Sequence, residues 1–250
     1  MSKPKRLLIL GGTGDATELA IKATDIPEVE VTTSLAGRTR QPITSFGNTR
    51  IGGFGGVAGL IDYLREQQID LLIDATHPFA AQISLNAAAA ATTMHIPHLM
   101  LIRPVWEPRA GDEWIEVESN TTAAKVLPGL AQRIFLTIGR QELAAFAHLK
   151  IWFLMRMIDP PLPDTIVPPG KILLDRGPFS LGNERSLLQQ YEIGAIVSKN
   201  SGGDATYAKI IAARERRIPV VMVQRPAVPA GEKVADVESA IAWLRDRVSK

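Results

Sequence analysis

The sequence predicts an α/β protein of two halves, each a parallel sheet flanked by helices, and three observations support this. Apolar segments of strand length alternate with segments of helical pattern along the whole chain, as in parallel sheets covered by helices. The chain opens with a strand, a glycine-rich turn and a helix. A proline-rich crossing at residues 103–108 divides it, so we expect a nucleotide-binding domain over residues 1–103 and a second domain over 104–250.

The first half is expected to form five strands and three helices. Residues 7–10 are four apolar residues in a row, as in a strand buried on both faces. Residues 29–33 are rich in β-branched side chains and residues 80–93 in alanine, which favour a strand and a helix respectively. The expected strands are residues 7–10, 29–33, 50–51, 70–74 and 98–102, and the expected helices are residues 15–24, 57–67 and 80–93.

The second half continues the same alternation without a close sequence repeat of the first. Apolar strand-length runs such as residues 133–137 and 220–223 are separated by longer segments of helical pattern. The expected strands are residues 114–117, 133–137, 152–155, 172–174, 195–198 and 220–223, and the expected helices are residues 122–130, 141–147, 180–191, 205–217 and 236–248.

Composition excludes several functional classes. The chain is 46% hydrophobic, which disfavours disorder, and its net charge of +2 is scattered, so no nucleic-acid partner is expected. Cysteine is absent, which excludes disulfides, thiolate nucleophiles and zinc–sulfur sites. His95 and His98 have no carboxylate or thiol nearby in the sequence, so no metal site is expected. We expect neither a membrane span nor a signal peptide, and a cytoplasmic protein.

The turn formed by Gly11, Gly12, Thr13 and Gly14 is the first candidate site. Glycine lets the backbone turn tightly and approach a ligand without an intervening Cβ. The helix that follows would direct its free N–H groups and positive dipole end at the turn, which suits a pyrophosphate. The spacing departs from the G-x-G-x-x-G pattern because Thr17 stands at the third glycine position. The turn therefore indicates a nucleotide site or an ordinary tight strand–helix connection.

The end of the second strand favours NADP(H) over NAD(H). NAD-binding units place an acidic residue there to bind the ribose 2′-hydroxyl. This chain instead continues with Ser34, Gly37, Arg38 and Thr39, and has no Asp or Glu at that point. A hydroxyl and a guanidinium suit a 2′-phosphate. The alternative is a solvated basic loop.

Two further strand ends of the first half carry candidate cofactor contacts. Four glycines in five positions surround Phe54 and include Gly53 and Gly55, which indicates close backbone approach to a ligand, with Phe54 stacking on a ring. Thr76 and His77 follow the strand at residues 70–74. His77 lies at a strand end, where ligands of open α/β sheets bind; the alternative is a histidine that caps the loop before Pro78.

The corresponding segments of the second half carry cations and hydroxyls. Because acids are not prominent among them, we expect an anionic ligand, either phosphates or a polycarboxylate. The chain has neither a G-x-S-x-G elbow nor a G-x-x-x-x-G-K-[ST] loop. The residues assigned to this ligand are Arg140, Arg176, Lys199, Ser201, Gly202 and Lys209.

An ordered set of sequence blocks resembles the precorrin-6A reductase family of cobalamin biosynthesis. The blocks are LILGGTGDATELA, TSLAGRT, IGGFGG, DATHPFA, FLTIGRQ, DRGPFS and SKNSGGDATYAKIIAARERRIPVVMVQRP, running from about Leu7 to Pro226. The resemblance implies two Rossmann-like domains with NADPH and a ligand cleft between them. It also implies reduction of one double bond of precorrin-6A to give precorrin-6B.

The resemblance implies hydride transfer from NADPH, with His77, Lys199 and Ser201 as candidates for supplying the accompanying proton. A wide cationic site would bind the carboxylate arms of the precorrin, and neighbouring pathway enzymes are possible transient partners. Three alternatives stay open: a cobalt-precorrin-6A reductase, another NADP-dependent reductase of a smaller substrate, and a non-catalytic NADP-binding sensor.

Overall fold

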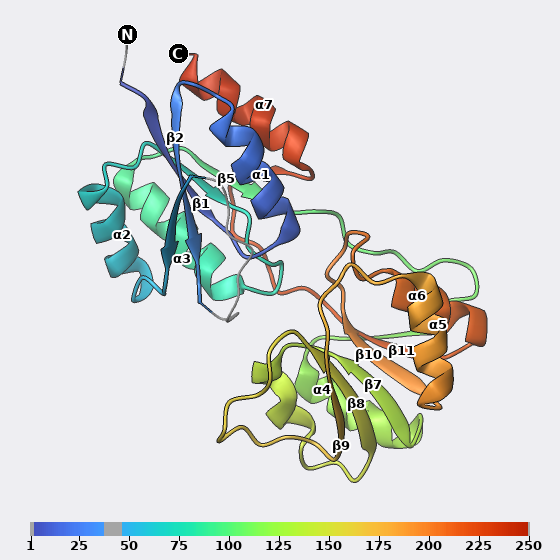
Figure 1. Cartoon of the computed structure of the whole chain (residues 1–250). Coiled ribbons are helices and arrows are strands. Elements are labelled where there is room, and N and C mark those ends of the chain that lie inside the picture. Colours follow the sequence, from blue (N-terminus) through green and yellow to red (C-terminus); the bar gives the residue numbers. More distant parts are fainter. Residues whose placement is uncertain (1–2, 38–46, 250) are drawn as a thin grey trace. The chain divides into compact units, whose positions relative to one another are not determined.

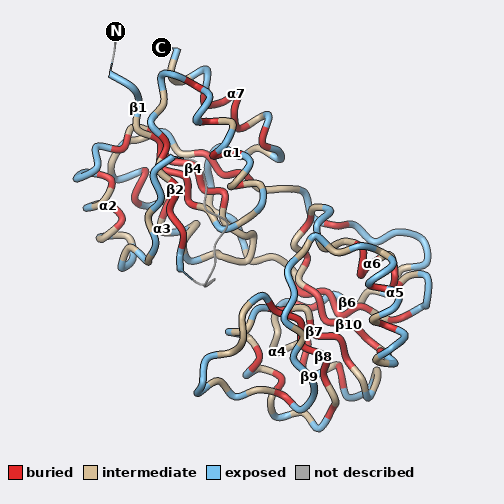
Figure 2. The backbone as a smooth tube through the Cα atoms, viewed as in Figure 1, coloured by how far each residue is buried: buried red, intermediate tan, exposed pale blue. Residues whose placement is uncertain are grey.

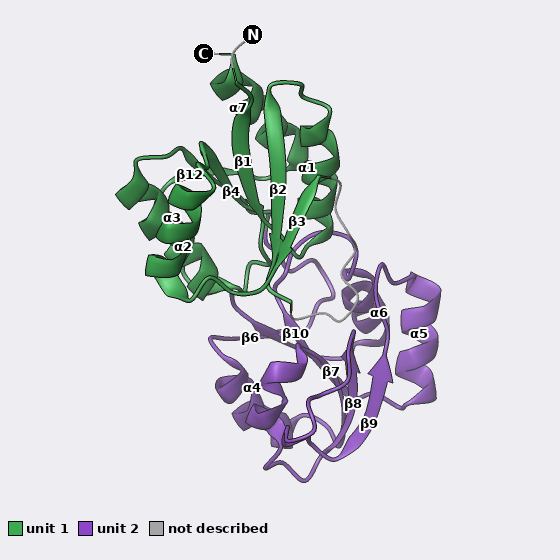
Figure 3. Ribbon diagram, turned by 60° about the vertical axis from the view of Figure 1, so that its left-hand side comes forward, with its two compact units in different colours: residues 1–104, 226–250 green, residues 105–225 purple. Residues whose placement is uncertain are grey.

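The computed structural model describes residues 3–37 and 47–249 (Figure 1). The chain folds into two compact units (Figure 3). Unit 1 contains Met1–Pro104 and Pro226–Lys250, and unit 2 contains Val105–Arg225. In each unit the buried residues follow the strands, so each has its own core (Figure 2).

Unit 1 is built on a six-stranded parallel sheet of order β12-β5-β4-β1-β2-β3. The chain starts in the middle at β1, runs to one edge through β2 and β3, and returns to form β4 and β5 on the other side. The strand order therefore reverses between β1 and β4, which is where ligands bind in open α/β sheets. The strands are β1 (Lys5–Leu10), β2 (Val29–Leu35), β3 (Asn48–Ile51), β4 (Leu71–Asp74), β5 (His98–Leu101) and β12 (Glu232–Val234).

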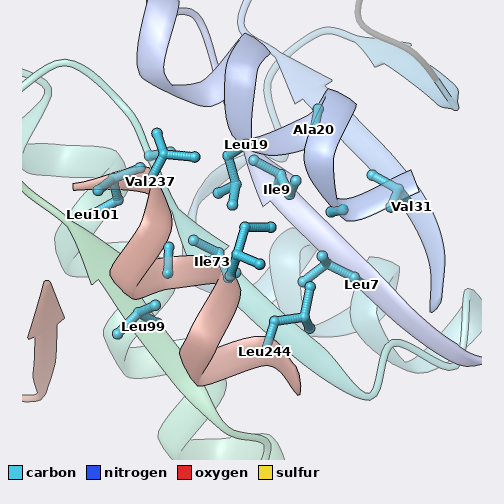
Figure 4. Packing of buried hydrophobic residues seen from close by; sticks show 14 of the residues in the cluster. Leu7, Ile9, Leu19, Ala20, Val31, Ile73, Leu99, Leu101, Val237 and Leu244 are labelled. Carbon is cyan, nitrogen blue, oxygen red and sulfur yellow. The ribbon is translucent and has the colours of Figure 1, made fainter. Parts of the chain in front are cut away.

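Helices cover both faces of this sheet because side chains alternate along its central strand. Leu7 and Ile9 of β1 pack with α1 (Gly14–Thr24) and α7 (Val237–Val248) (Figure 4). Leu8 and Leu10 pack on the opposite side with α2 (Gly56–Glu66) and α3 (Ala81–Met94). A strand buried on both faces reads as the continuous apolar run from which it was predicted.

Unit 2 repeats the strand order of unit 1 with a different sixth strand. Its parallel sheet has the order β6-β11-β10-β7-β8-β9, and the order reverses between β7 and β10. The edge strand beside β11 is β6, the first strand of this unit. The corresponding edge strand of unit 1, beside β5, is β12, the last strand of the chain. The strands are β6 (Trp114–Val117), β7 (Arg133–Thr137), β8 (Trp152–Met157), β9 (Gly170–Leu174), β10 (Ala195–Lys199) and β11 (Val220–Val223).

The helices of unit 2 are shorter and include two 3-10 segments. On one face α5 (Leu181–Gln190) and α6 (Ala208–Arg216) pack on β7 and β10. The remaining elements are α4 (Asn120–Val126), η1 (Leu127–Gly129) and η2 (Arg140–Phe146). The helix expected at 141–147 is therefore a 3-10 helix, and the one expected at 122–130 is split between α4 and η1.

The predicted fold class is confirmed, but the assignment of all residues 104–250 to the second domain is wrong. Unit 1 ends its first segment at Pro104, one residue beyond the expected boundary, and the chain re-enters unit 1 at Pro226. The short strand β12, which was not predicted, pairs with β5, and α7 completes the core with α1. Strand pairing by β12 and core packing by α7 therefore place the C-terminal segment in unit 1.

Candidate functional site

The glycines of the β1–α1 turn have two different structural roles. A Cβ at Gly11 would lie 3.1 Å from Thr33 Cγ2 and 3.3 Å from Leu35 Cδ2, so Gly11 permits close packing of β1 on β2. Gly12 has a φ of +110°, a conformation that favours glycine. A Cβ at Gly12 or Gly14 would meet no atom within 4 Å. These two positions therefore leave the backbone open to close approach by a ligand.

Thr13 holds the turn in place through its hydroxyl group. Its Oγ1 accepts a hydrogen bond from the N–H of Ala16 at 3.0 Å and donates one to the Ala75 carbonyl at 2.8 Å. The first bond caps α1, and the second ties the turn to the segment after β4. In the same helical turn, Asp15 forms a 3.0 Å ion pair with Arg103, which offsets negative charge near the helix N-terminus.

Arg50 connects the end of β2 to the glycine-rich loop after β3, a role that the sequence did not reveal. Its Nη1 donates to Ser34 Oγ at 3.0 Å and to the Gly52 carbonyl at 2.7 Å. Its Nη2 donates to the Gly53 carbonyl at 3.0 Å. The guanidinium also lies 3.9 Å from the centroid of the Phe54 ring. A cation directly before a glycine block was the available signal for this contact.

Phe54 packs against two neighbouring side chains. Arg50 covers the ring, and Tyr63 contacts it edge-on with centroids 5.2 Å apart. A Cβ at Gly59 would lie 1.8 Å from the Phe54 carbonyl oxygen, so glycine is required where the loop meets α2. Arg50 and Tyr63 therefore occupy part of the ring surface of the half-buried Phe54, and its stacking on a ligand ring stays a prediction.

The other glycines assigned to the cofactor lie near the same edge of the sheet. Gly55 precedes α2 with a φ of +81°, and Cβ atoms at Gly53 and Gly55 would meet nothing within 4 Å. Gly37 has a φ of +69°, and its Cβ would contact Ile51 Cγ2 at 3.1 Å. Arg38 and Thr39 lie outside the described residues.

A pocket lies at the carboxyl ends of β4 and β5, entirely within unit 1. The buried Asp74 carboxylate accepts hydrogen bonds from the N–H of Thr76 at 3.0 Å and from its hydroxyl at 2.6 Å. His77 Nδ1 accepts from the Phe79 N–H at 3.2 Å, which leaves Nε2 as the protonated nitrogen of a neutral ring. The lining residues are Asp74, Thr76, His77, Pro78, Ala81, Ser84, Leu101, Ile102, Ala227, Val228 and Pro229.

In unit 2 the predicted substrate residues are spread over several strand ends. Arg140 follows β7 and donates from Nη1 to the Pro160 carbonyl at 2.9 Å. Lys199 ends β10 and forms an ion pair with Glu142. Ser201 follows it, with its hydroxyl 3.4 Å from the Lys199 carbonyl oxygen. These three side chains belong to the carboxyl edge of the sheet, as expected.

Two loops at this edge are joined to each other. Arg176 follows β9, and its N–H donates to the Asp175 carboxylate at 2.8 Å. Phe179, three residues further on, donates its N–H to the Ala205 carbonyl at 3.0 Å. Gly202, with a φ of +66°, lies in that second loop. The hydrogen bond fixes the loop bearing Arg176 against the loop bearing Gly202.

Lys209 is buried, so its predicted contact with substrate is corrected. The residue is only 4% exposed, and its Nζ donates to the Thr206 carbonyl at 2.8 Å and lies 5.0 Å from the Trp106 ring centroid. Burial lowers the pKa of Lys209 to about 7; the Arg156 charge also lowers it, and Glu184 opposes the shift. Lys209 is a buried lysine in the core of unit 2.

The lowered pKa of Lys209 predicts a pH-dependent stability. Between about pH 7 and the usual lysine pKa of 10.5 the unfolded chain binds a proton that the folded chain does not. The free energy of unfolding therefore rises as the pH increases over this window. The gain is lost again as the pH falls back to about 7. Urea unfolding at pH 7 and pH 9.5 should show wild type gaining stability relative to Lys209→Met. If the difference in stability between wild type and Lys209→Met is the same at both pH values, Lys209 does not lose its proton in the folded protein over this range.

Asn200 is a second residue that the sequence did not single out. It is 3% exposed, and its side-chain amide bonds both backbone groups of Trp106, at 2.8 and 3.0 Å. The backbone carbonyl of Asn200 accepts a hydrogen bond from Arg225 Nε at 2.8 Å. Trp106 is the second residue of unit 2, and Arg225 is its last residue. Asn200 therefore joins both connecting segments to the loop after β10.

The described residues contain neither a metal-binding cluster nor a membrane-spanning helix. Over residues 3–37 and 47–249, no three or more His, Cys, Asp or Glu side chains come together as a metal-binding group. Among the helices of those residues, none has the length and apolar character required to cross a bilayer.

The sheet order and the glycine turn at its reversal define a doubly wound α/β protein of the Rossmann type. Comparison with known proteins narrows this class. The family described as Precorrin-6x reductase CbiJ/CobK matches residues 6–245, and the chain belongs to this family. It is a reductase, which implies a nicotinamide cofactor.

Individual relatives agree with this membership. Precorrin-6A reductase of Rhodococcus erythropolis is 52% identical over 242 residues, which cover 96% of this chain and 97% of the relative. A solved structure of CobK precorrin-6A reductase is 42% identical with a TM-score of 0.91, over 97% of this chain and 96% of its own. Cobalt-precorrin-6A reductase of Methanothermobacter thermautotrophicus is 32% identical over 248 residues, covering 89% and 77% of the two chains. The family predicted from the sequence blocks is confirmed.

Proposed function

We propose that this protein reduces precorrin-6A to precorrin-6B with NADPH, in the cytoplasm. The observation that carries the proposal is the open glycine turn at the point where the strand order of unit 1 reverses. Membership of the family, together with the higher identity to precorrin-6A reductases than to the cobalt-precorrin relative, supports the choice of substrate.

The residues of the turn fit a dinucleotide. The backbone at Gly12 and Gly14 is open to approach, and the first N–H groups of α1 lack intrahelical partners. Both features favour a pyrophosphate at this position. NADPH, when bound, supplies a hydride to one ring double bond, and a proton completes the reduction. The chain's own contribution is to hold the cofactor and substrate in position and to supply charge.

The preference for NADPH over NADH rests on the end of β2, where Ser34 and Arg38 stand in place of an acid. Replacing Arg38 with alanine should weaken NADPH binding with little effect on NADH, because only NADPH carries a 2′-phosphate. Fluorescence titration with both nucleotides measures this directly. Equal losses for the two would refute the assigned role.

His77 is the group we favour for the proton. Its Nδ1 accepts the Phe79 N–H, which holds the ring in one orientation. Donation of a proton would require the imidazolium form, in which this hydrogen bond is given up. In contrast, Lys199 is paired with Glu142. On the substrate side, Arg140, Arg176 and Lys199 supply cations for carboxylate arms.

The proposal is tested by following NADPH absorbance with purified protein and enzymatically generated precorrin-6A, with NADH in parallel. Oxidation of NADPH with a matching change in the visible spectrum of the ring supports it. Binding of NADPH without oxidation would point to the cobalt-containing substrate or to a sensor. No binding would refute the nucleotide role of the turn. Adding neighbouring pathway enzymes tests whether transient contacts increase the rate.

A further inference from the structure

The loop that joins β10 to α6 lies at the point where the strand order of unit 2 reverses. Ligands of open α/β sheets bind at such a point. The loop contains Ser201 and Gly202, both assigned to the substrate, followed by Gly203. Gly202 and Gly203 have φ values of +66° and +71°. Because two adjacent glycines have a large conformational freedom to lose, contacts from outside the loop are needed to hold them in one conformation.

The first residue of this loop, Asn200, is fixed by Trp106. The Asn200 side-chain amide accepts the Trp106 N–H at 2.8 Å and donates to the Trp106 carbonyl at 3.0 Å. The backbone N–H of Asn200 donates to the Val223 carbonyl at 2.9 Å, so β11 supports the same residue. The backbone of Trp106 is thus bound directly to the residue that precedes Ser201.

The Trp106 side chain fixes the loop on the other side of Ser201 and Gly202. Its indole Nε1–H donates to the Gly203 carbonyl at 2.8 Å. A single residue therefore binds both Asn200 and Gly203, and the two residues assigned to the substrate lie between these attachment points.

The indole ring is itself held in the core of unit 2. Trp106 is 8% exposed and belongs to the cluster of buried residues that packs on β7 and β10. Its ring centroid lies 5.6 Å from that of Tyr207 and 5.0 Å from Lys209 Nζ. Rotation of the indole away from Gly203 would disrupt this close packing. The indole N–H is therefore a fixed attachment point for the loop.

We propose that Trp106 is a positioning residue for the substrate, because it holds the Ser201–Gly202 segment in one conformation. This role rests on the proposed function, since it concerns how unit 2 binds the carboxylated tetrapyrrole of that reaction. Trp106 acts through the loop and not on the reacting atoms. A loop that is ordered before the substrate arrives loses less conformational entropy on binding, which increases the affinity.

The test replaces Trp106 with phenylalanine in the full chain, which keeps an aromatic ring and removes the indole N–H. Trp114→Phe is the matched control in the same unit, because within the described residues the buried Trp114 Nε1 has no hydrogen-bond partner. KM is measured for precorrin-6A and NADPH separately, and uroporphyrin III, a stable tetrapyrrole with carboxylate arms, is titrated by fluorescence.

We expect Trp106→Phe to raise the KM for precorrin-6A and the Kd for the porphyrin about five- to tenfold, as for the loss of one buried hydrogen bond. The KM for NADPH should not change, because the nucleotide is assigned to unit 1. Trp114→Phe should match wild type in all three measurements.

Hydrogen exchange separates a positioning role from a purely structural one. Peptides that cover residues 199–206 should exchange faster in Trp106→Phe than in wild type, whereas peptides from β7 and β8 should keep their wild-type rates. Faster exchange over the whole of unit 2 would mean that the variant loses global stability, and this would contradict the positioning role.

Three kinetic or binding results would also overturn the role of Trp106. These are an unchanged KM for precorrin-6A in Trp106→Phe, an equal rise in Trp114→Phe, and an equal rise in the KM for NADPH. Failure of the proposed reaction looks different, because wild type would then leave NADPH unoxidised with precorrin-6A. In that case the porphyrin titration decides: weaker binding by Trp106→Phe alone supports the role, and equal binding by both variants, or none by wild type, refutes it.

Discussion

Replacing Gly14 with alanine should weaken NADPH binding at least tenfold while the protein keeps its fold. Gly14 is the first residue of α1, and a Cβ there would meet no protein atom within 4 Å. Alanine is also the better helix former, by about 1 kcal/mol. The added methyl group would instead occupy space through which a pyrophosphate approaches the helix N-terminus. Nucleotide titration and urea unfolding measure the two effects separately.

Gly11→Ala is the matched control, because it adds the same methyl group three residues earlier. There the Cβ would press on Thr33 and Leu35 at 3.1 and 3.3 Å, so we expect lower stability, by about 1–3 kcal/mol. Gly11→Ala is thus expected to lower stability, and Gly14→Ala is expected to lower NADPH affinity. Wild-type NADPH affinity in Gly14→Ala would show that the cofactor does not come close to this residue.

The sequence was sufficient for features that depend on neighbouring residues. A four-residue apolar run, a glycine turn and a capped helix are encoded within residues 7–24, so β1, the turn and α1 could be predicted. The different roles of Gly11 and Gly14 could not, because they depend on β2, more than fifteen residues away in the chain. The same holds for Arg50, whose partners lie on another strand and loop.

The errors arise from long-range pairing and from unusual burial. The strand β12 has three residues, Glu232–Val234, and only its pairing with β5 identifies it as part of the first sheet. Lys209 was assigned to an anionic ligand because it follows a strand end that carries cations and hydroxyls. On α6, however, it stands between the buried residues Ala208 and Ile210. A helix buried this extensively leaves a lysine no route to solvent.

Replacing Glu184 with alanine should destabilise unit 2 by about 3–5 kcal/mol, the cost of leaving a buried charge without its partner. Arg156 and Glu184 are 6% and 1% exposed and are joined by two hydrogen bonds of 2.5 and 3.1 Å. The guanidinium also lies 4.7 Å from the Phe135 ring centroid and 3.6 Å from that of Phe179. Water cannot easily replace the missing carboxylate beside this buried guanidinium.

Urea unfolding followed by tryptophan fluorescence measures this effect in unit 2, which contains Trp106, Trp114 and Trp152. The control is Arg185→Ala on α5, the helix of Glu184, which breaks the ion pair between Arg185 and Glu215 of α6. Those side chains are 50% and 40% exposed, so solvent screens the pair and little change is expected. A similar loss in both variants would mean that burial of the Arg156–Glu184 pair is unimportant.

A double replacement, Arg156→Met with Glu184→Leu, decides where the cost of the single variant arises. If the loss reflects an uncompensated charge, removing both charges restores much of the stability, because apolar side chains can fill a dry site. If it reflects lost attraction, the double variant is no more stable than Glu184→Ala. We expect recovery in the double variant. The Arg156 charge lowers the pKa of Lys209 and Glu184 raises it. Removing Glu184 alone therefore leaves the Arg156 charge uncompensated and lowers the pKa of Lys209 further, whereas the double replacement removes both influences.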